Sequence, residues 1–222
     1  MQLLSLRTAE RILDSHIHIA DGPDTPEEFH QKMARGGISG GIVISRPPST
    51  YRTIAEPWPN EKRLKHVFTY TEGQPHCYPF YWVDPLEDDA VEQVTAAAAA
   101  GVAGFKIICD RFYVSDEPAM ATACAIAATG KPVLFHSGIL WDGKPSSRYN
   151  RPAEFEALLD VADIRFALAH ISWPWYDECI AVYGKFLTSR RRRPEVSAEM
   201  FIDTTPGTPL IYRRDALTKL FT

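Results

Sequence analysis

Two histidines separated by a single residue stand near the start of the chain, in the sequence Asp14-Ser15-His16-Ile17-His18. Because side chains alternate between the two faces of a strand, this spacing places both imidazoles on one face, where they can converge on one ion. The run is otherwise apolar and is expected to be a buried strand, and buried imidazoles need polar partners. We therefore interpret His16 and His18 as metal ligands. The alternative is a pair of core histidines that form hydrogen bonds within the protein.

Two further histidines end apolar runs elsewhere in the chain. His136 follows the run 133–135, and His170 follows the run 166–169. A site of three histidine nitrogens, an oxygen ligand and a water is typical of zinc, with manganese, iron or cobalt as alternatives. Such an ion lowers the pKa of its water to about 7, so that a nucleophile forms near neutral pH. The other histidines, His30, His66 and His76, fall in helix or loop segments and are expected at the surface.

Strands must position these histidines, and the sequence predicts a series of short ones. The β-branched and aromatic runs are 12–19, 40–45, 79–84, 104–109, 132–137, 165–172 and 199–204. Between most of them lie stretches of helical composition, and this alternation predicts parallel strands joined by right-handed crossovers. No Gly-rich phosphate loop follows the first strand, which favours an α/β fold of the (β/α)8 TIM-barrel type over a doubly wound sheet, the alternative. Barrel active sites are built at the C-terminal strand ends, so the four histidines are expected to meet there.

Three segments are expected to be helices, 88–101, 115–129 and 210–221. The segment 46–76 is long and rich in proline and aromatic residues, with a possible extra strand at 66–71. A connection of that length is typical of a functional loop or an inserted hairpin.

The composition is that of one soluble domain spanning residues 1–222. With 222 residues, 45% of them hydrophobic, and a net charge of -4, the chain can bury a full core and offers no generally basic surface to nucleic acid. The 4 cysteines are scattered, with no C-x-x-C pair, as in proteins with reduced thiols. Residues 1–11 lack the apolar segment of a secretory signal, and no uncharged run approaches the roughly 18 residues of a membrane helix. We expect a cytoplasmic protein that acts on a small molecule and binds neither nucleic acid nor membrane.

The chain resembles the amidohydrolase superfamily, in particular the amidohydrolase-related branch that includes aminocarboxymuconate semialdehyde decarboxylase. The resemblance rests on the D-x-H-x-H motif at 14–18 and on the segments 104–107, 134–138 and 168–170, in the family's order. It implies that His16, His18 and His136 bind a divalent metal, Zn2+ first and Mn2+ second. It also implies that His170 is a catalytic acid that polarises the scissile group, or else a ligand of a second metal. Homodimers are common in this family.

The resemblance implies supporting parts for three other residues. Asp14 would support the ligands without binding the ion, or would be an ordinary strand-end carboxylate. Lys106 stands where some members carry a carbamylated lysine between two metals. We do not predict carbamylation, because pairing with a carboxylate or binding of a substrate anion is the simpler interpretation. Asp203 ends the seventh predicted strand and would face the same cavity as a supporting residue or a ligand of a second metal, although its place in the strand order is not that of the family's metal-binding aspartate.

The family pattern also includes a metal-binding aspartate at the end of an eighth strand, and the sequence ends before such a strand. Against the roughly 250 residues of a typical barrel, we expect a barrel that lacks the last strand and helix at its C-terminus.

Loops after the predicted strands carry the candidates for substrate contact. Trp141 and Arg148 follow the fifth strand, Trp173 follows the sixth, and Arg111 follows the fourth. Aromatic walls with a few arginines suit a small acidic or aromatic ligand.

The leading functional hypothesis is a metal-dependent hydrolase, with metal-activated water attacking a C–O or C–N bond of a small carboxylated or cyclic substrate. A non-oxidative decarboxylase that uses the same metal site is the first alternative. A catalytically inactive, truncated barrel is the second.

Overall fold

A curled parallel sheet forms the centre of the molecule in the computed structural model, which describes residues 11–19, 25–51, 57–205 and 207–222. The strands are β1 (Leu13–His18), β2 (Gly40–Ile44), β3 (Cys77–Trp82), β4 (Gly104–Ile107), β5 (Val133–Phe135), β6 (Arg165–Leu168) and β7 (Glu199–Ile202). Each pairs in parallel with the next, so the strand order in space is the order in the chain. The predicted α/β fold with parallel strands is confirmed.

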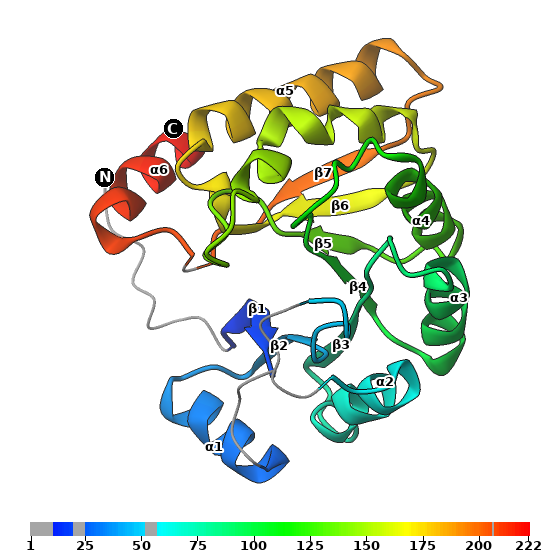
Figure 1. The fold of residues 1–222 in the computed structure, drawn as a ribbon. Coiled ribbons are helices and arrows are strands. Elements are labelled where there is room, and N and C mark those ends of the chain that lie inside the picture. The colour runs from blue at the N-terminus through cyan, green and yellow to red at the C-terminus, as the bar shows by residue number, and fades with distance from the viewer. Residues whose placement is uncertain (1–10, 20–24, 52–56, 206) are drawn as a thin grey trace.

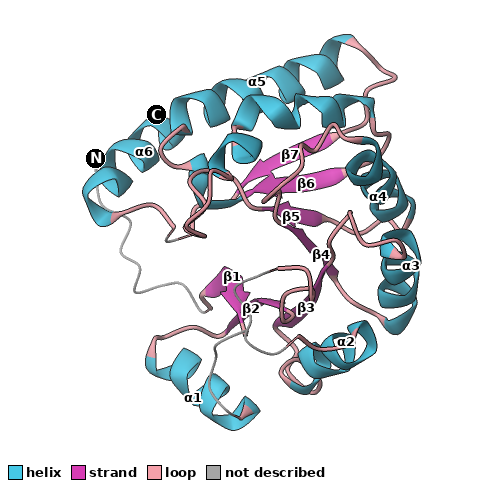
Figure 2. Cartoon of the chain, in the orientation of Figure 1, coloured by secondary structure: helices cyan, strands magenta, loops and turns pink. Residues whose placement is uncertain are grey.

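Helices connect the strands and follow the outer side of the curl (Figures 1 and 2). They are α1 (Pro26–Arg35), α2 (Asn60–Thr69), α3 (Ala90–Ala100), α4 (Glu117–Ala128), α5 (Tyr176–Arg192) and α6 (Leu210–Phe221). Two 3-10 helical segments, Ser147–Asn150 and Pro152–Asp160, lie between β5 and β6. β1 and β7 are the two ends of the strand order, and no backbone pairing joins them among the described residues. The architecture is therefore a barrel-type sheet of 7 strands that is open between its first and last strands.

Local sequence signals account for the ends of several helices. Thr25 and Glu28 form a capping box at the start of α1, in which each side chain accepts a hydrogen bond from the other residue's backbone N–H. The alanine-rich α3 ends at Gly101, whose φ of 98° is accessible to glycine at little cost. The expected helices at 88–101, 115–129 and 210–221 are confirmed as α3, α4 and α6.

The extra strand expected at 66–71 is wrong, because α2 covers most of that segment. Arg63 and Val67, four residues apart, bury one face of this helix. The Arg63 side chain is fully buried and donates hydrogen bonds to the backbone carbonyls of Arg46 and Trp82, at 3.1 and 3.0 Å. Helical periodicity and a buried guanidinium thus override the β-branched and aromatic composition of 66–71.

The two faces of the sheet bury different kinds of residue. The outer face packs on the helices through side chains such as Tyr81, Phe105 and Phe135. The inner face carries a smaller apolar cluster that includes Trp82 and Leu134. Lys106 pairs in register with both Trp82 and Leu134, so its side chain lies on the inner face at the same level.

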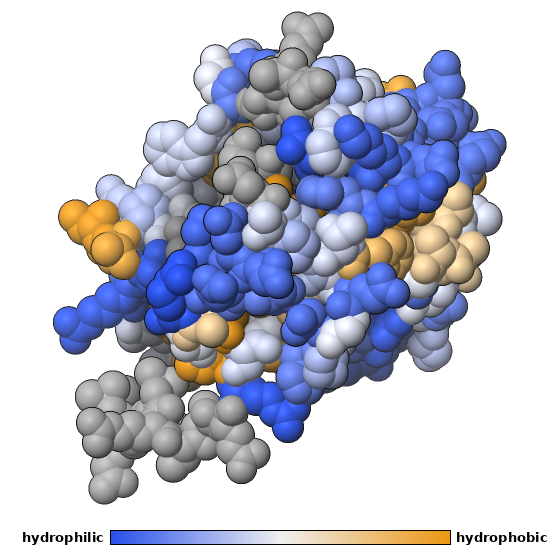
Figure 3. Space-filling model, turned by 90° about the horizontal axis from the view of Figure 1, so that it is seen from below, coloured by the Kyte–Doolittle hydropathy of each residue, from blue (hydrophilic) through white to orange (hydrophobic). Residues whose placement is uncertain are grey.

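The outer surface is mainly hydrophilic on the face shown in Figure 3, with separate hydrophobic patches. None of the described helices has the length and apolar character that a membrane-crossing helix needs. Residues 1–10, which make up most of the segment expected to lack a secretory signal, lie outside the described residues.

Candidate metal centre

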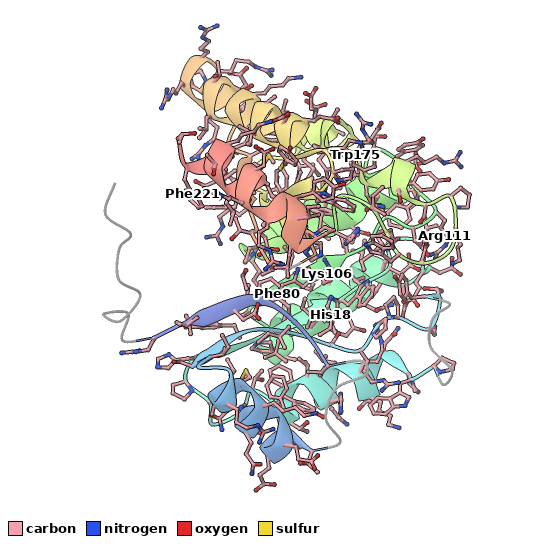
Figure 4. All side chains as sticks on the ribbon, turned by 90° about the vertical axis from the view of Figure 1, so that its left-hand side faces the viewer. His18, Phe80, Lys106, Arg111, Trp175 and Phe221 are labelled. Carbon is pink, nitrogen blue, oxygen red and sulfur yellow. The ribbon has the colours of Figure 1, made fainter. Side chains whose placement is uncertain are left out.

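The predicted site residues come together at the C-terminal ends of the strands. His16 and His18 lie on β1, His136 follows β5, His170 follows β6 and Asp203 follows β7. Figure 4 shows His18 and Lys106 near the centre of the molecule. Because all strands run parallel, side chains far apart in the sequence share this edge.

The nitrogens of His16 face two different partners. Its Nε2 lies 3.0 Å from Nε2 of His18, and its Nδ1 lies 3.4 Å from Oδ2 of Asp203. The rings of His16 and His170 are stacked with centroids 4.7 Å apart. His16, His170 and Asp203 each place a possible ligand atom within 4.8 Å of the other two. The residue types and spacings fit a small metal centre.

His136 supplies a further nitrogen without a protein partner. Its ring centroid lies 5.4 Å from that of His170, and its Nε2 is buried with no hydrogen-bond partner among the described residues. A buried ring nitrogen without a partner is costly in a metal-free protein. The orphaned nitrogen therefore supports the interpretation of His136 as a ligand.

Burial keeps the histidines neutral. Desolvation, followed by the positive charge of Lys106, lowers the pKa of His16 and holds the pKa of His18 and His136 well below the ordinary value. Desolvation also lowers the pKa of His170 to about 3. Neutral imidazoles are the form that binds metal, so these rings are ready to act as ligands at neutral pH.

Asp203 is the anion at the centre of the group. Ser15 Oγ donates to its Oδ1, Thr205 Oγ1 donates to its Oδ2, and the His170 backbone N–H donates to Oδ2 at 3.3 Å. Burial disfavours the charged carboxylate, but the side-chain hydrogen bonds of His16, Ser15 and Thr205 outweigh burial and hold the Asp203 pKa below its usual range. The strand order argued against Asp203 as the family's metal-binding aspartate, and the structure places its carboxylate beside the His16 ring.

Ser15 and Thr205 are two contacts that the sequence analysis missed. The β1–β2 register shifts between Asp14 and Ile17, which marks a bulge in β1. A bulge changes the alternation of side chains, so Ser15 reaches the same side as His16. Thr205 follows Asp203 by two residues, and its Oγ1 lies 3.3 Å from Nδ1 of both His16 and His170.

A left-handed turn carries His170. The φ values of His170, Ile171 and Ser172 are 60°, 46° and 55°, a conformation that L-residues other than Asn and Asp rarely adopt. The Ile171 N–H donates to the Asp203 backbone carbonyl at 2.7 Å, and Thr208 Oγ1 donates to the His170 carbonyl at 2.9 Å. These bonds hold the strained turn and fix the His170 ring beside His16.

The tautomer of His170 follows from its surroundings. The Gly207 N–H donates to Nδ1 of His170 at 3.2 Å. Since a neutral imidazole has one acceptor and one donor nitrogen, we assign the proton to Nε2. His170 can therefore offer an N–H donor to a group bound beside the centre.

Lys106 is a buried cation without a fixed partner. Its side chain is fully buried, and Nζ has no hydrogen-bond partner among the described residues. Burial lowers the Lys106 pKa to about 7, against the opposing charge of Asp203. The paired-lysine alternative is not what the structure shows, since no described carboxylate lies within ion-pair distance of Nζ.

The remaining predicted residues divide between the centre and the surface. Asp14 Oδ1 accepts a hydrogen bond from the His16 backbone N–H at 2.9 Å, which supports the strand without reaching the imidazoles. Trp173 stacks on the exposed Trp141 with centroids 6.3 Å apart, and its Nε1 is a buried donor without a described partner. Arg148 is exposed and donates to the Tyr149 hydroxyl at 2.6 Å, so the structure turns it towards Tyr149.

Comparison with known proteins shows the fold. No protein-family model matches the chain, and no curated protein sequence does. Among solved structures, the 5-carboxyvanillate decarboxylase of Sphingomonas paucimobilis is similar with a TM-score of 0.65 at 10% identity, over 95% of this chain and 85% of that one. The dihydroorotase of Campylobacter jejuni is similar with a TM-score of 0.51 at 13% identity, over 86% of this chain and 52% of that one.

A third similar structure holds a metal. It is the 5-carboxyvanillate decarboxylase of Novosphingobium aromaticivorans with bound manganese and a nitrobenzoic acid, with a TM-score of 0.53 at 10% identity, over 78% of this chain and 61% of that one. This chain therefore spans less than two thirds of the length of two of the three proteins. It shares with all of them its fold, an α/β sheet of barrel type.

Proposed function

We propose that the chain is a metal-dependent enzyme of the amidohydrolase superfamily that hydrolyses a C–O or C–N bond of a small carboxylated or cyclic substrate. The observation that carries the proposal is the convergence of four histidines and Asp203 at the C-terminal strand ends, where His136 Nε2 has no hydrogen-bond partner in the described part of the chain. Manganese in the similar decarboxylase supports a divalent metal. Zn2+ is the first candidate, because histidine nitrogens in a buried site suit it.

Each side chain has a stated part in this proposal. His16, His18 and His136 would hold the ion, and Asp203 would fix the His16 ring through Nδ1, as carboxylates commonly do for metal-bound histidines. A bound ion supplies an activated water near neutral pH and polarises the bond to be broken.

His170 and Lys106 handle the substrate. The Nε2–H of His170 would donate a hydrogen bond to the scissile group, and the strained turn fixes its direction. The Nζ of Lys106, which has no hydrogen-bond partner among the residues that the structure describes, would bind the carboxylate of the substrate.

A decarboxylase is the second candidate. It is favoured by the similarity of fold to the 5-carboxyvanillate decarboxylase over 95% of this chain. In that reaction the substrate carboxylate leaves as carbon dioxide and a proton takes its place on carbon, with no net addition of water.

Product analysis separates the two reactions. Metal-loaded protein is incubated in H2 18O with a panel of esters, lactones, amides and aromatic carboxylates, beside His170→Gln and a control His30→Gln on α1. Hydrolysis is expected to place one 18O in the acid product, and His170→Gln is expected to be slower by about a hundredfold or more. Carbon dioxide release without 18O in the product contradicts the hydrolase assignment in favour of the lyase. Stoichiometric metal with no turnover on the whole panel supports the inactive barrel.

A further inference from the structure

A polar cavity lies at the same edge of the sheet as the candidate metal centre. This rim cavity has a volume of about 520 Å3 and is lined by Ser49, Thr50, Asp110, Arg111 and Lys144. These residues follow β2, β4 and β5, so the rim cavity opens at the C-terminal strand ends. Its volume is within the range of small-molecule sites.

Arg111 is held in the cavity wall by two carboxylates. Its Nη1 donates to Asp110 at 2.7 Å, and its Nη2 donates to Asp84. Both aspartates are 5% exposed, whereas the Arg111 side chain is 38% exposed. The two bonds use one hydrogen of each terminal nitrogen, so the guanidinium is fixed in position with N–H groups left to donate.

Among the residues that line the rim cavity, Arg111 and Lys144 carry hydrogen-bond donors that remain open to it. Lys144 Nζ is 4.0 Å from Asp110, beyond hydrogen-bond distance, and its side chain is 39% exposed. The oxygens of Asp84 already accept from Thr50, from the Leu86 N–H and from Arg111. A fixed guanidinium and an ammonium without a short hydrogen bond among the described residues, beside the buried Asp84 and Asp110, match an acceptor-rich ligand.

Aromatic contacts connect the rim cavity with the metal centre. Tyr51, next to Thr50 in the chain, packs on Trp82 with centroids 4.8 Å apart. The Trp82 ring in turn meets the edge of His18 at 5.5 Å. Figure 4 shows Arg111 to one side of His18 and Lys106. These ring contacts link the loop that carries Thr50 to His18 at the metal centre.

We infer that the rim cavity is a subsite for a second oxyanion of the substrate, a carboxylate or a phosphate, bound by Arg111 and Lys144 and remote from the reacting group. The substrate is then a molecule with an acidic group at each end, or a molecule whose one acidic group is separated from a neutral scissile bond. This inference deepens the proposed function and rests on it for the position of the reacting group, but oxyanion binding itself needs no metal.

Calorimetric titration of the metal-free protein tests the subsite at low ionic strength. The ligands are malonate, its neutral isostere malonamide, and inorganic phosphate. The variants are Arg111→Met and Lys144→Met, with Lys185→Met on α5 as the control, since Lys185 is similarly exposed at 48% and pairs with Glu156 far from the cavity residues in sequence. Arg111→Met leaves the buried Asp84 and Asp110 without their guanidinium partner. If that variant fails to fold, Lys144→Met still tests the subsite, because the Lys144 ammonium makes no short hydrogen bond with the described residues.

The expected result is that malonate or phosphate binds at least about tenfold more tightly than malonamide. Lys144→Met and Arg111→Met are each expected to weaken the binding of that oxyanion by about tenfold or more. Preference for malonate assigns a carboxylate, and preference for phosphate assigns a phosphoryl group. Equal binding of malonate, phosphate and malonamide overturns the subsite, and so does full affinity in Lys144→Met. The same titration on His16→Ala separates the two proposals. This variant removes a proposed metal ligand and leaves the residues of the rim cavity unchanged, so oxyanion binding is expected to persist whether or not the metal centre exists.

Discussion

Buried neutral histidines are the chemical basis of the candidate centre. The H-x-H spacing and the two strand-end histidines could be predicted from the sequence, because residue type and strand periodicity decide which face they occupy. The part of Asp203 could not be predicted from the sequence, since its contacts with Ser15 and Thr205 depend on a bulge and on the approach of β7 to β1.

The lowered histidine pKa values predict acid sensitivity of the metal-free protein. Below about pH 6.5 the unfolded chain takes up protons on histidines that stay neutral in the folded state, so stability falls as the pH falls. Desolvation holds the pKa of the buried His136 well below the ordinary value, so this residue contributes up to about one proton to the difference. Urea denaturation at pH 7.5, 6.5 and 5.5 is expected to show a slope smaller by up to about 1.4 kcal/mol per pH unit in His136→Asn. An unchanged slope would mean that His136 titrates normally in the folded protein.

Asp203 and Asp14 offer a matched pair of carboxylates near His16. Asp203→Asn removes the charge beside His16 Nδ1 and is expected to weaken metal binding about tenfold to a hundredfold. Asp14→Asn keeps an oxygen that can accept from the His16 backbone N–H, so it is expected to bind metal like the wild type. Competition with a chelating dye measures both affinities. Equal effects of the two substitutions would refute the positioning part of Asp203.

At the scale of elements, the strands were predictable, whereas one left-handed turn and the helix α2 were not. The composition and the hydrophobic period of the sequence indicate apolar strands that alternate with capped helices. All seven strands could therefore be expected from the sequence. The left-handed turn at 170–172 contains no glycine that would have signalled it. The helix α2 was missed because Arg63, a charged residue, is one of the residues on its buried face.

The strained turn makes a prediction at this scale. Ser172 is fully buried with a φ of 55°, so Ser172→Gly removes the steric cost of the left-handed conformation, whereas Ser172→Ala keeps it. Both variants lose the same hydroxyl. Ser172→Gly is expected to be more stable than Ser172→Ala by about 1 kcal/mol, measured by urea denaturation. Equal stability, or the reverse order, would show that the turn stores no strain at this position.

For the whole molecule, the centre joins the two open ends of the sheet. Contacts of Ser15 and His16 with Asp203 bring β1 and β7 together where no backbone pairing is present among the described strands. A metal held from β1 and β5, with Asp203 behind His16, is therefore expected to stabilise both edges. Hydrogen exchange with and without Zn2+ should show added protection in 11–19 and in 199–205. Protection confined to one of these segments would argue against a centre shared between the edges.

Metal stoichiometry tests the central claim most directly. The protein is loaded with Zn2+, desalted and measured by inductively coupled plasma mass spectrometry, beside the double variant His16→Ala/His18→Ala and a control double variant, His30→Ala/His76→Ala. Circular dichroism checks that all three are folded. We expect about one ion per chain in the wild type and the control, and loss of the ion in His16→Ala/His18→Ala. A full equivalent of metal in that variant would contradict the site.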